Sequence, residues 1–143
     1  MMRSFTSHRN HIFTISIFML FSLLACSDYD KQAINALLDA RDIAVSTHNI
    51  RGYDALLLPD YHDKSGQSEF DIVSKMNKLF AQFEETEMTS SNRVIRMLDE
   101  HSAECEQSYL LRVKADGTWR QLNQRERITL SKTNDGWKIS GGL

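Results

Sequence analysis

Apolar residues recur every three or four positions over two stretches of the chain, which is the spacing of a helix that buries one face. In residues 29–48 this face is formed by Ile34, Leu37, Leu38, Arg41 and Val45, of which Arg41 is charged. From Ser68 onward the apolar positions are Ile72, Val73, Met76, Leu79, Phe80 and Phe83. A short helix is predicted between them over residues 51–58, closed by Pro59. The pattern therefore predicts three helices.

Beyond Glu87 the pattern changes to short alternating runs rich in β-forming residues. Strands are predicted over residues 93–98, 102–114, 118–132 and 137–141. The Asp-Gly pairs at 116–117 and 135–136 are typical of tight hairpins. Helices followed by an antiparallel meander predict the α+β class, with one face of the sheet covered by the helices.

Alternation also assigns the two faces of the central strands. One face carries Ala103, Cys105, Gln107, Tyr109, Leu111 and Val113, together with Leu122, Gln124, Glu126, Ile128 and Leu130. The other carries both signs of charge: Glu104, Glu106, Arg112, Lys114, Arg125 and Arg127. This charged face is either solvated and salt-bridged or the interface of a homodimer.

The amino-terminal segment has the pattern of an export signal. Arg3 and Arg9 precede an apolar run over residues 12–24, which is shorter than the roughly 20 residues that a bilayer-spanning helix needs. The run ends in Leu23-Leu24-Ala25-Cys26, which resembles the bacterial lipobox. An uncleaved anchor or an ordinary secretory signal is the alternative.

The lipobox resemblance implies that residues 1–25 are a cleaved signal peptide and that Cys26 carries the lipid. Residues 26–28 would then be a short tether, and the acyl chains would hold the protein on a membrane. Ser27 after the cysteine implies the periplasmic side of the outer membrane in a Gram-negative cell. In other bacteria the protein would be located at the outer face of the cytoplasmic membrane.

Charge and cysteine content narrow the choice of function. The chain has 17 basic and 19 acidic residues, a net charge of −2, and its basic cluster at Arg125 to Arg127 is interrupted by Glu126. Nucleic-acid binding is therefore excluded. With Cys26 taken by lipid, Cys105 is left alone and is expected to be a small buried apolar residue.

The carboxy-terminal runs Arg125 to Lys132 and Asp135 to Ile139 resemble the final hairpin of the NTF2-like superfamily, also described as SnoaL-like or cystatin-like α+β folds. The stretch from Tyr53 to Tyr61 lies where that superfamily has its second helix. The resemblance covers residues 29–143. It implies a cone in which three helices pack on a curved antiparallel sheet of about four strands.

The cone of such proteins encloses a pocket, which some members use for isomerase or dehydratase chemistry and others for binding. The pocket candidates in this chain are Tyr61, His62, Gln107, Tyr109, Gln124 and Glu126. For an enzyme, Glu126 would be the general base and Tyr109 would stabilise an oxyanion. The competing interpretation makes Glu126 the cross-strand partner of an arginine.

This expected fold and cellular location are compatible with three functions. We expect foremost a binding domain for a small apolar ligand or a protein partner. The alternatives are an acid/base enzyme, which a cavity filled by Phe80, Phe83 and Trp137 would argue against, and a structural accessory subunit of an envelope complex. No metal is expected, because Tyr61-His62-Asp63 has no second histidine at ligand spacing, and no cofactor motif is present.

Overall fold

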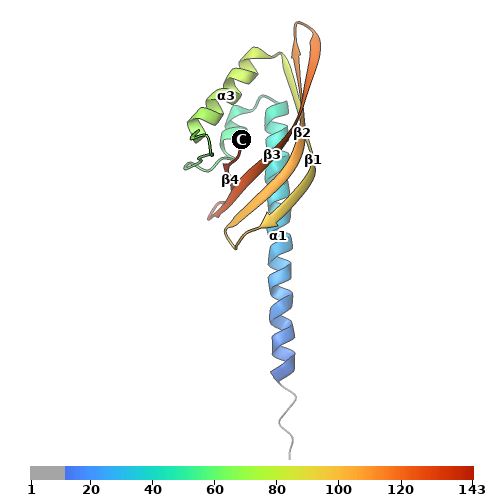
Figure 1. The fold of residues 1–143 in the computed structure, drawn as a ribbon, viewed down its shortest axis with the longest axis vertical. Helices are drawn as coiled ribbons and strands as arrows, with labels where there is room; N and C mark the ends of the chain where they lie inside the picture. The colour runs from blue at the N-terminus through green and yellow to red at the C-terminus, as the bar shows by residue number, and fades with distance from the viewer. Residues whose placement is uncertain (1–11) are drawn as a thin grey trace, which may run out of the picture. The chain divides into compact units, whose positions relative to one another are not determined.

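The computed structural model describes the backbone of residues 12–143 and the side chains of residues 27–143. The elements in chain order are α1 (Ile12–Ser46), α2 (Ile50–Asp54), α3 (Glu69–Gln82), β1 (Glu85–Met97), β2 (Ser102–Ala115), β3 (Thr118–Thr133) and β4 (Gly136–Gly141) (Figure 1). The chain divides into two units, Met1–Gln32 and Ala33–Leu143. The first contains α1 from Ile12, and the second contains the rest of α1 and every other described element.

The predicted signal and lipid site fall largely outside this description. Residues 1–11 and the side chain of Cys26 lie outside the described residues. The backbone of α1 continues through residues 26–28, where the tether was expected. Within the part of the chain that the structure describes, no helix is both long enough and apolar enough to cross a bilayer.

The four strands form one antiparallel sheet in the order β1-β2-β3-β4, so the predicted α+β class with a four-stranded meander is confirmed. β1 begins at Glu85 rather than near residue 93. The sequence pattern missed this part of β1 because its buried positions are Thr86 and Met88, and a threonine gives little apolar alternation.

The prediction for residues 51–58 was wrong in extent, because α2 ends at Asp54. The leucines that follow it pack along β4 instead. Leu57 forms a parallel bridge with Ile139, and the Leu58 N–H donates to the Ile139 carbonyl at 2.8 Å. A short apolar run next to proline is compatible with either conformation, and here the contact with β4 decides it.

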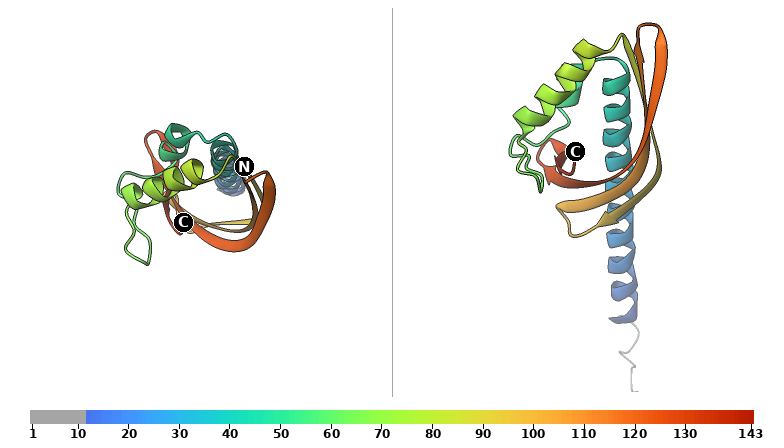
Figure 2. Two further views of the ribbon diagram at one scale, coloured as in Figure 1. Left: turned by 90° about the horizontal axis from the view of Figure 1, so that it is seen from above. Right: turned by 45° about the horizontal axis from the view of Figure 1, so that its top comes forward.

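The core lies between the inner face of the sheet and the helices. Ile34, Leu38 and Val45 of α1 are buried, and so are Cys105 and Ile128 on the sheet. The expectation that Cys105 is a buried apolar residue is therefore confirmed, and burial raises the pKa of its thiol. Figure 2 shows the sheet curving so that α3 lies across its concave side.

The outer face of the sheet carries cross-strand ion pairs, which the salt-bridged interpretation predicted, and the homodimer interface stays a prediction. Lys114 pairs with Glu85 at 2.6 Å, Arg127 pairs with Glu106 at 2.6 Å, and Arg112 pairs with Glu87 at 2.5 Å. Because these pairs are partly exposed to solvent, each contributes little to stability.

The two edges of the sheet differ. At β1, side chains of α1 bind the outward backbone groups: the Met88 N–H donates to Ser46 Oγ and the Ser90 N–H to Asp42 Oδ2, both at 2.8 Å. At the other edge, β4 pairs with β3 only over Thr129–Thr133. Residues 118–128 of β3 therefore have a strand neighbour on one side only.

Candidate functional site

A buried ion pair lies inside the cone, between α1 and β3. Arg41 donates from Nη1 to Glu126 Oε1 at 2.6 Å and from Nη2 to Oε2 at 3.1 Å. Their side chains are 6% and 10% exposed. Gln107 of β2, directly opposite Glu126, donates from Nε2 to the same Oε1 at 2.7 Å. The carboxylate therefore accepts hydrogen bonds at both oxygens.

A β-bulge extends this cluster toward the surface. The pairing of β1 with β2 shifts between Ser91 and Val94, and Asn92 takes the left-handed conformation with φ 55°. The bulge places two residues of β1 opposite Gln107. Arg93 donates from Nε to Gln107 Oε1 at 2.8 Å and pairs with Asp39 of α1 at 2.6 Å. The Gln107 amide thus joins Arg93, whose side chain is 14% exposed, to the buried pair.

Two tyrosines complete the cluster. The Arg41 Cζ lies 5.8 Å from the centroid of the Tyr109 ring. Burial raises the pKa of both Tyr53 and Tyr109, although the positive charge of Arg41 opposes the rise in each. Both are neutral phenols at physiological pH.

Arg41 remains charged in this environment. Its burial lowers its pKa, but the neighbouring Glu126 carboxylate and the Tyr53 phenol more than offset that effect, so the pKa lies above its usual range. Its Nε is buried and has no hydrogen-bond partner among the described residues.

The structure brings Gln107, Tyr109 and Glu126 into one cluster, and Tyr61, His62 and Gln124 lie outside that cluster, although His62 lines the same cavity as Glu126. Tyr61 is fully buried, and its hydroxyl accepts a hydrogen bond from the Leu143 N–H at 2.8 Å. His62 is exposed, with Nδ1 3.0 Å from the Asp60 carbonyl oxygen. Gln124 is opposite Tyr109, but it is exposed to solvent.

Sequence reasoning missed the partners of Glu126. The expected arginine lies on a helix rather than on a neighbouring strand, since Arg41 is on α1 and 85 residues away. Its signal was a charged residue within the apolar stripe Ile34 to Val45. Nothing in the sequence around Arg93 indicated its contact with Gln107, because the bulge determines which way the Arg93 side chain points.

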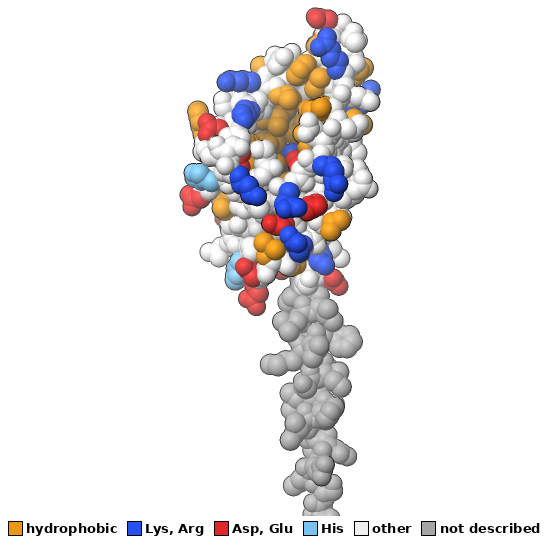
Figure 3. Space-filling view, viewed as in Figure 1, with side chains coloured by type: hydrophobic (Ala, Val, Ile, Leu, Met, Phe, Trp, Pro, Cys, Tyr) orange, Lys and Arg blue, Asp and Glu red, His pale blue; other side chains and the backbone are white. Residues whose placement is uncertain are grey.

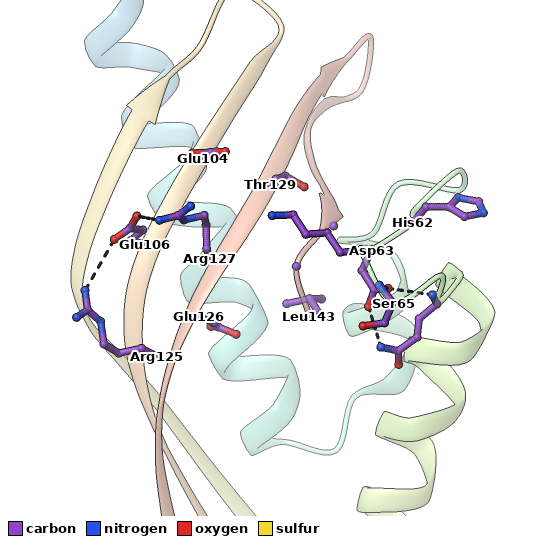
Figure 4. A pocket seen from close by; sticks show the side chains of 14 residues that line it. His62, Asp63, Ser65, Glu104, Glu106, Arg125, Glu126, Arg127, Thr129 and Leu143 are labelled. Atoms are coloured by element: carbon purple, nitrogen blue, oxygen red, sulfur yellow. Dashed lines mark hydrogen bonds and ion pairs between the residues drawn. The ribbon is translucent and has the colours of Figure 1, made fainter.

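A cavity of about 940 Å³ lies beside the uncovered edge of β3. Its lining residues are His62, Asp63, Lys64, Ser65, Gln67, Glu104, Glu106, Arg125, Glu126, Arg127, Thr129, Gly141, Gly142 and Leu143. Figure 4 shows Glu126 on one side of β3, with Arg125 and Arg127 reaching toward Glu106 on the other. The cavity therefore extends around the strand edge and is mostly polar.

Phe80, Phe83 and Trp137, which would argue against an enzyme if they filled the cavity, do not line it. Phe80 stacks on His48 with ring centroids 4.7 Å apart, and Trp137 is buried in the core. Leu111 is half-buried on the inner face, and its cross-strand neighbour Leu122 is 47% exposed. Figure 3 shows hydrophobic side chains around a hollow on the face it views.

Comparison with solved structures identifies the architecture. A nuclear transport factor 2 (NTF2-like) superfamily protein from Salmonella enterica matches with a TM-score of 0.71 at 15% identity, over 81% of this chain and 89% of that one. The fold is NTF2-like. A hexachlorocyclohexane dehydrochlorinase (LinA, type 2) matches with a TM-score of 0.72 at 12% identity, over 83% and 87% of the two chains.

A protein from Novosphingobium aromaticivorans, provisionally assigned as a scytalone dehydratase, matches with a TM-score of 0.76 at 15% identity, over 83% and 85% of the two chains. No protein-family model and no curated protein matches the sequence. At these identities the NTF2-like likeness establishes the fold alone. Among the described residues, no three His, Cys, Asp or Glu side chains are placed to hold a metal ion.

Proposed function

We propose that this protein is a membrane-tethered binding protein whose NTF2-like cone takes a small, mostly apolar ligand. The tether in this proposal is a lipid on Cys26, at the periplasmic side of the outer membrane in a Gram-negative cell. The tether is supported by the residue pattern up to Cys26. The binding role is supported above all by one observation, the closed ion pair between Arg41 and Glu126.

This ion pair argues against acid/base catalysis by Glu126. A general base must have an oxygen within hydrogen-bond reach of the substrate proton. Both oxygens of Glu126 already accept hydrogen bonds, from the two Nη atoms of Arg41 and from the Gln107 amide. A substrate proton would have to share the carboxylate with the charge-assisted hydrogen bonds of Arg41, which are among the stronger kinds.

The inner face of the sheet supplies what a mostly apolar ligand needs. Leu111 and Leu122 offer partly exposed apolar surface on the strands that also carry Tyr109. Binding pockets for small molecules combine apolar walls with a few polar groups that fix orientation. The neutral phenol of Tyr109 can donate one such hydrogen bond, so the proposed ligand has one acceptor, such as a carbonyl or hydroxyl oxygen.

The test is recovery of a bound small molecule from the full-length protein, extracted in mild detergent and analysed by mass spectrometry. Leu111→Glu should lose the molecule, because it places a charge on the apolar wall, and Tyr109→Phe should retain less of it. Leu98→Glu is the matched control, since Leu98 is 53% exposed and directly follows β1.

Circular dichroism and thermal unfolding would establish that each variant is folded. Equal recovery of the same molecules from wild type and folded Leu111→Glu would contradict the binding proposal. Turnover of the recovered molecule that Glu126→Gln abolishes would favour the enzyme instead.

A further inference from the structure

The uncovered part of β3 is a free strand edge. Residues 118–128 pair with β2 without a register shift, whereas β4 reaches β3 only at Thr129. No strand of the described chain lies on the other side of this segment, although Gly142 packs against the backbone of Arg127 and Ile128, so the open part of the edge is residues 118–126. The opposite edge of the sheet, at β1, has fewer free backbone groups, because Ser46 and Asp42 of α1 already accept hydrogen bonds from it. An unpaired edge is a template for an added strand.

The direction of the free backbone groups follows from the C-terminal segment. A β carbon at Gly142 would clash with the carbonyl oxygen of Arg127, so this carbonyl points away from β2. Backbone groups alternate sides along an antiparallel strand. The outward N–H and C=O groups of the free edge are therefore those of Trp119, Gln121, Asn123 and Arg125.

The side chains beside this edge select the kind of strand that fits. On the outer face, Arg125 and Arg127 have side chains 81% and 58% exposed and share a single carboxylate, Glu106, at 3.8 and 2.6 Å. Two guanidinium groups on one carboxylate leave an excess of positive charge. On the inner face, Leu122 is 47% exposed.

We propose that the free edge of β3 binds an extended segment of another protein by strand addition. The segment alternates acidic residues, which face Arg125 and Arg127, with apolar residues, which face Leu122. Main-chain hydrogen bonds hold such a segment, and its alternate side chains determine specificity. The cavity beside Arg125 and Arg127 gives room for the end of the added strand.

Charge favours this partner over a second copy of the chain. Pairing two β3 edges would bring together two segments that each carry Arg120, Arg125 and Arg127 and only one acidic residue, Glu126. Of the charges within the edge, Glu126 is already committed to Arg41. Like charges across a strand pair are destabilising.

The test uses the full-length protein in mild detergent and two blocked eight-residue peptides, one alternating glutamate with valine and the other alternating lysine with valine. Amide hydrogen exchange is followed at single residues. The glutamate peptide should protect the outward amides of Gln121 and Asn123 and bind at least about tenfold more tightly than the lysine peptide.

Matched variants separate backbone pairing from charge. Asn123→Pro removes an outward N–H, which an edge strand tolerates, and should weaken binding about tenfold, whereas Asn123→Ala should bind as wild type does. Arg125→Glu should also weaken binding, whereas Arg96→Glu on the outer face of β1 should not.

Equal protection by both peptides, no protection by either, or equal binding by Asn123→Pro and Asn123→Ala would overturn the proposal. Protection of the same amides that grows with protein concentration in the absence of peptide would assign the edge to a second copy instead.

Discussion

Arg41 lies on the buried face of α1, where its charge is compensated by Glu126 across the cone. Removing an ion from water costs several kcal/mol, and a buried pair roughly offsets that cost only when its hydrogen bonds are complete. Here Gln107 and Tyr53 add to the pairing. The pair therefore adds little net stability, but loss of either partner would leave the charge of the other buried and uncompensated.

Glu126→Gln should lower the free energy of unfolding by about 3–5 kcal/mol, because it leaves the charge of Arg41 buried without a counter-ion. The double variant Arg41→Met/Glu126→Leu should lose much less, since it removes both charges together. Urea denaturation followed by circular dichroism measures both. Arg125→Gln, on the exposed face one residue away, is the control and should change stability by less than about 0.5 kcal/mol. Wild-type stability in Glu126→Gln would contradict the role of the pair.

The tyrosines of the cone predict a loss of stability at alkaline pH. Burial raises the pKa of Tyr53 in the folded chain, while in the unfolded chain the phenol ionises near its ordinary pKa of about 10. A raised folded pKa contributes stability that is complete below the unfolded pKa and is lost as pH rises through the folded one. The free energy of unfolding should therefore fall above about pH 10.

Tyr53→Phe should make this alkaline decline shallower, because one ionisable phenol is removed. The measurement is urea denaturation at a series of pH values between about 8 and 11. Tyr29→Phe, at a side chain that is 73% exposed, is the control. Identical slopes for wild type and Tyr53→Phe would show that Tyr53 does not couple folding to pH.

At the scale of the elements, the bulge in β1 determines where Arg93 reaches. Its left-handed residue is Asn92, with φ 55°, a conformation that glycine and asparagine tolerate and β-branched residues do not. Asn92→Val should lower the free energy of unfolding by about 1–2 kcal/mol, whereas Asn92→Gly should stay near wild type. Thermal and urea unfolding compare the two. Equal stabilities would mean that the bulge does not constrain this position.

At the scale of the whole molecule, the proposed lipid on Cys26 is the feature that would hold the NTF2-like unit at a membrane. Cys26→Ser should abolish incorporation of an alkyne-labelled palmitate and leave the signal segment uncleaved, because the thiol is the proposed site of modification. Cys105→Ser is the matched control, since Cys105 is fully buried. Unchanged labelling of Cys26→Ser would exclude the lipoprotein assignment.

Local patterns were sufficient for most of the architecture. Apolar spacing predicted α3 and the part of α1 from residue 29 onward, and alternation predicted the inner and outer faces of β2 and β3, because both patterns repeat within one element. They failed where burial does not require an apolar residue, as at Thr86 of β1, and where contact with β4 draws Leu57 out of a helix. The lipid on Cys26 stays a prediction from the local residue pattern.

Local sequence patterns were sufficient to predict three helices, a meander and the position of Glu126 on the inner face. Tertiary packing brings Glu126 to Arg41 and, through the bulge at Asn92, turns Arg93 toward Gln107. It also ends the pairing with β4 at Thr129, so residues 118–128 of β3 pair with β2 alone. Periodicity acts over a few residues. An ion pair between residues 85 apart depends instead on how a helix lies across a curved sheet.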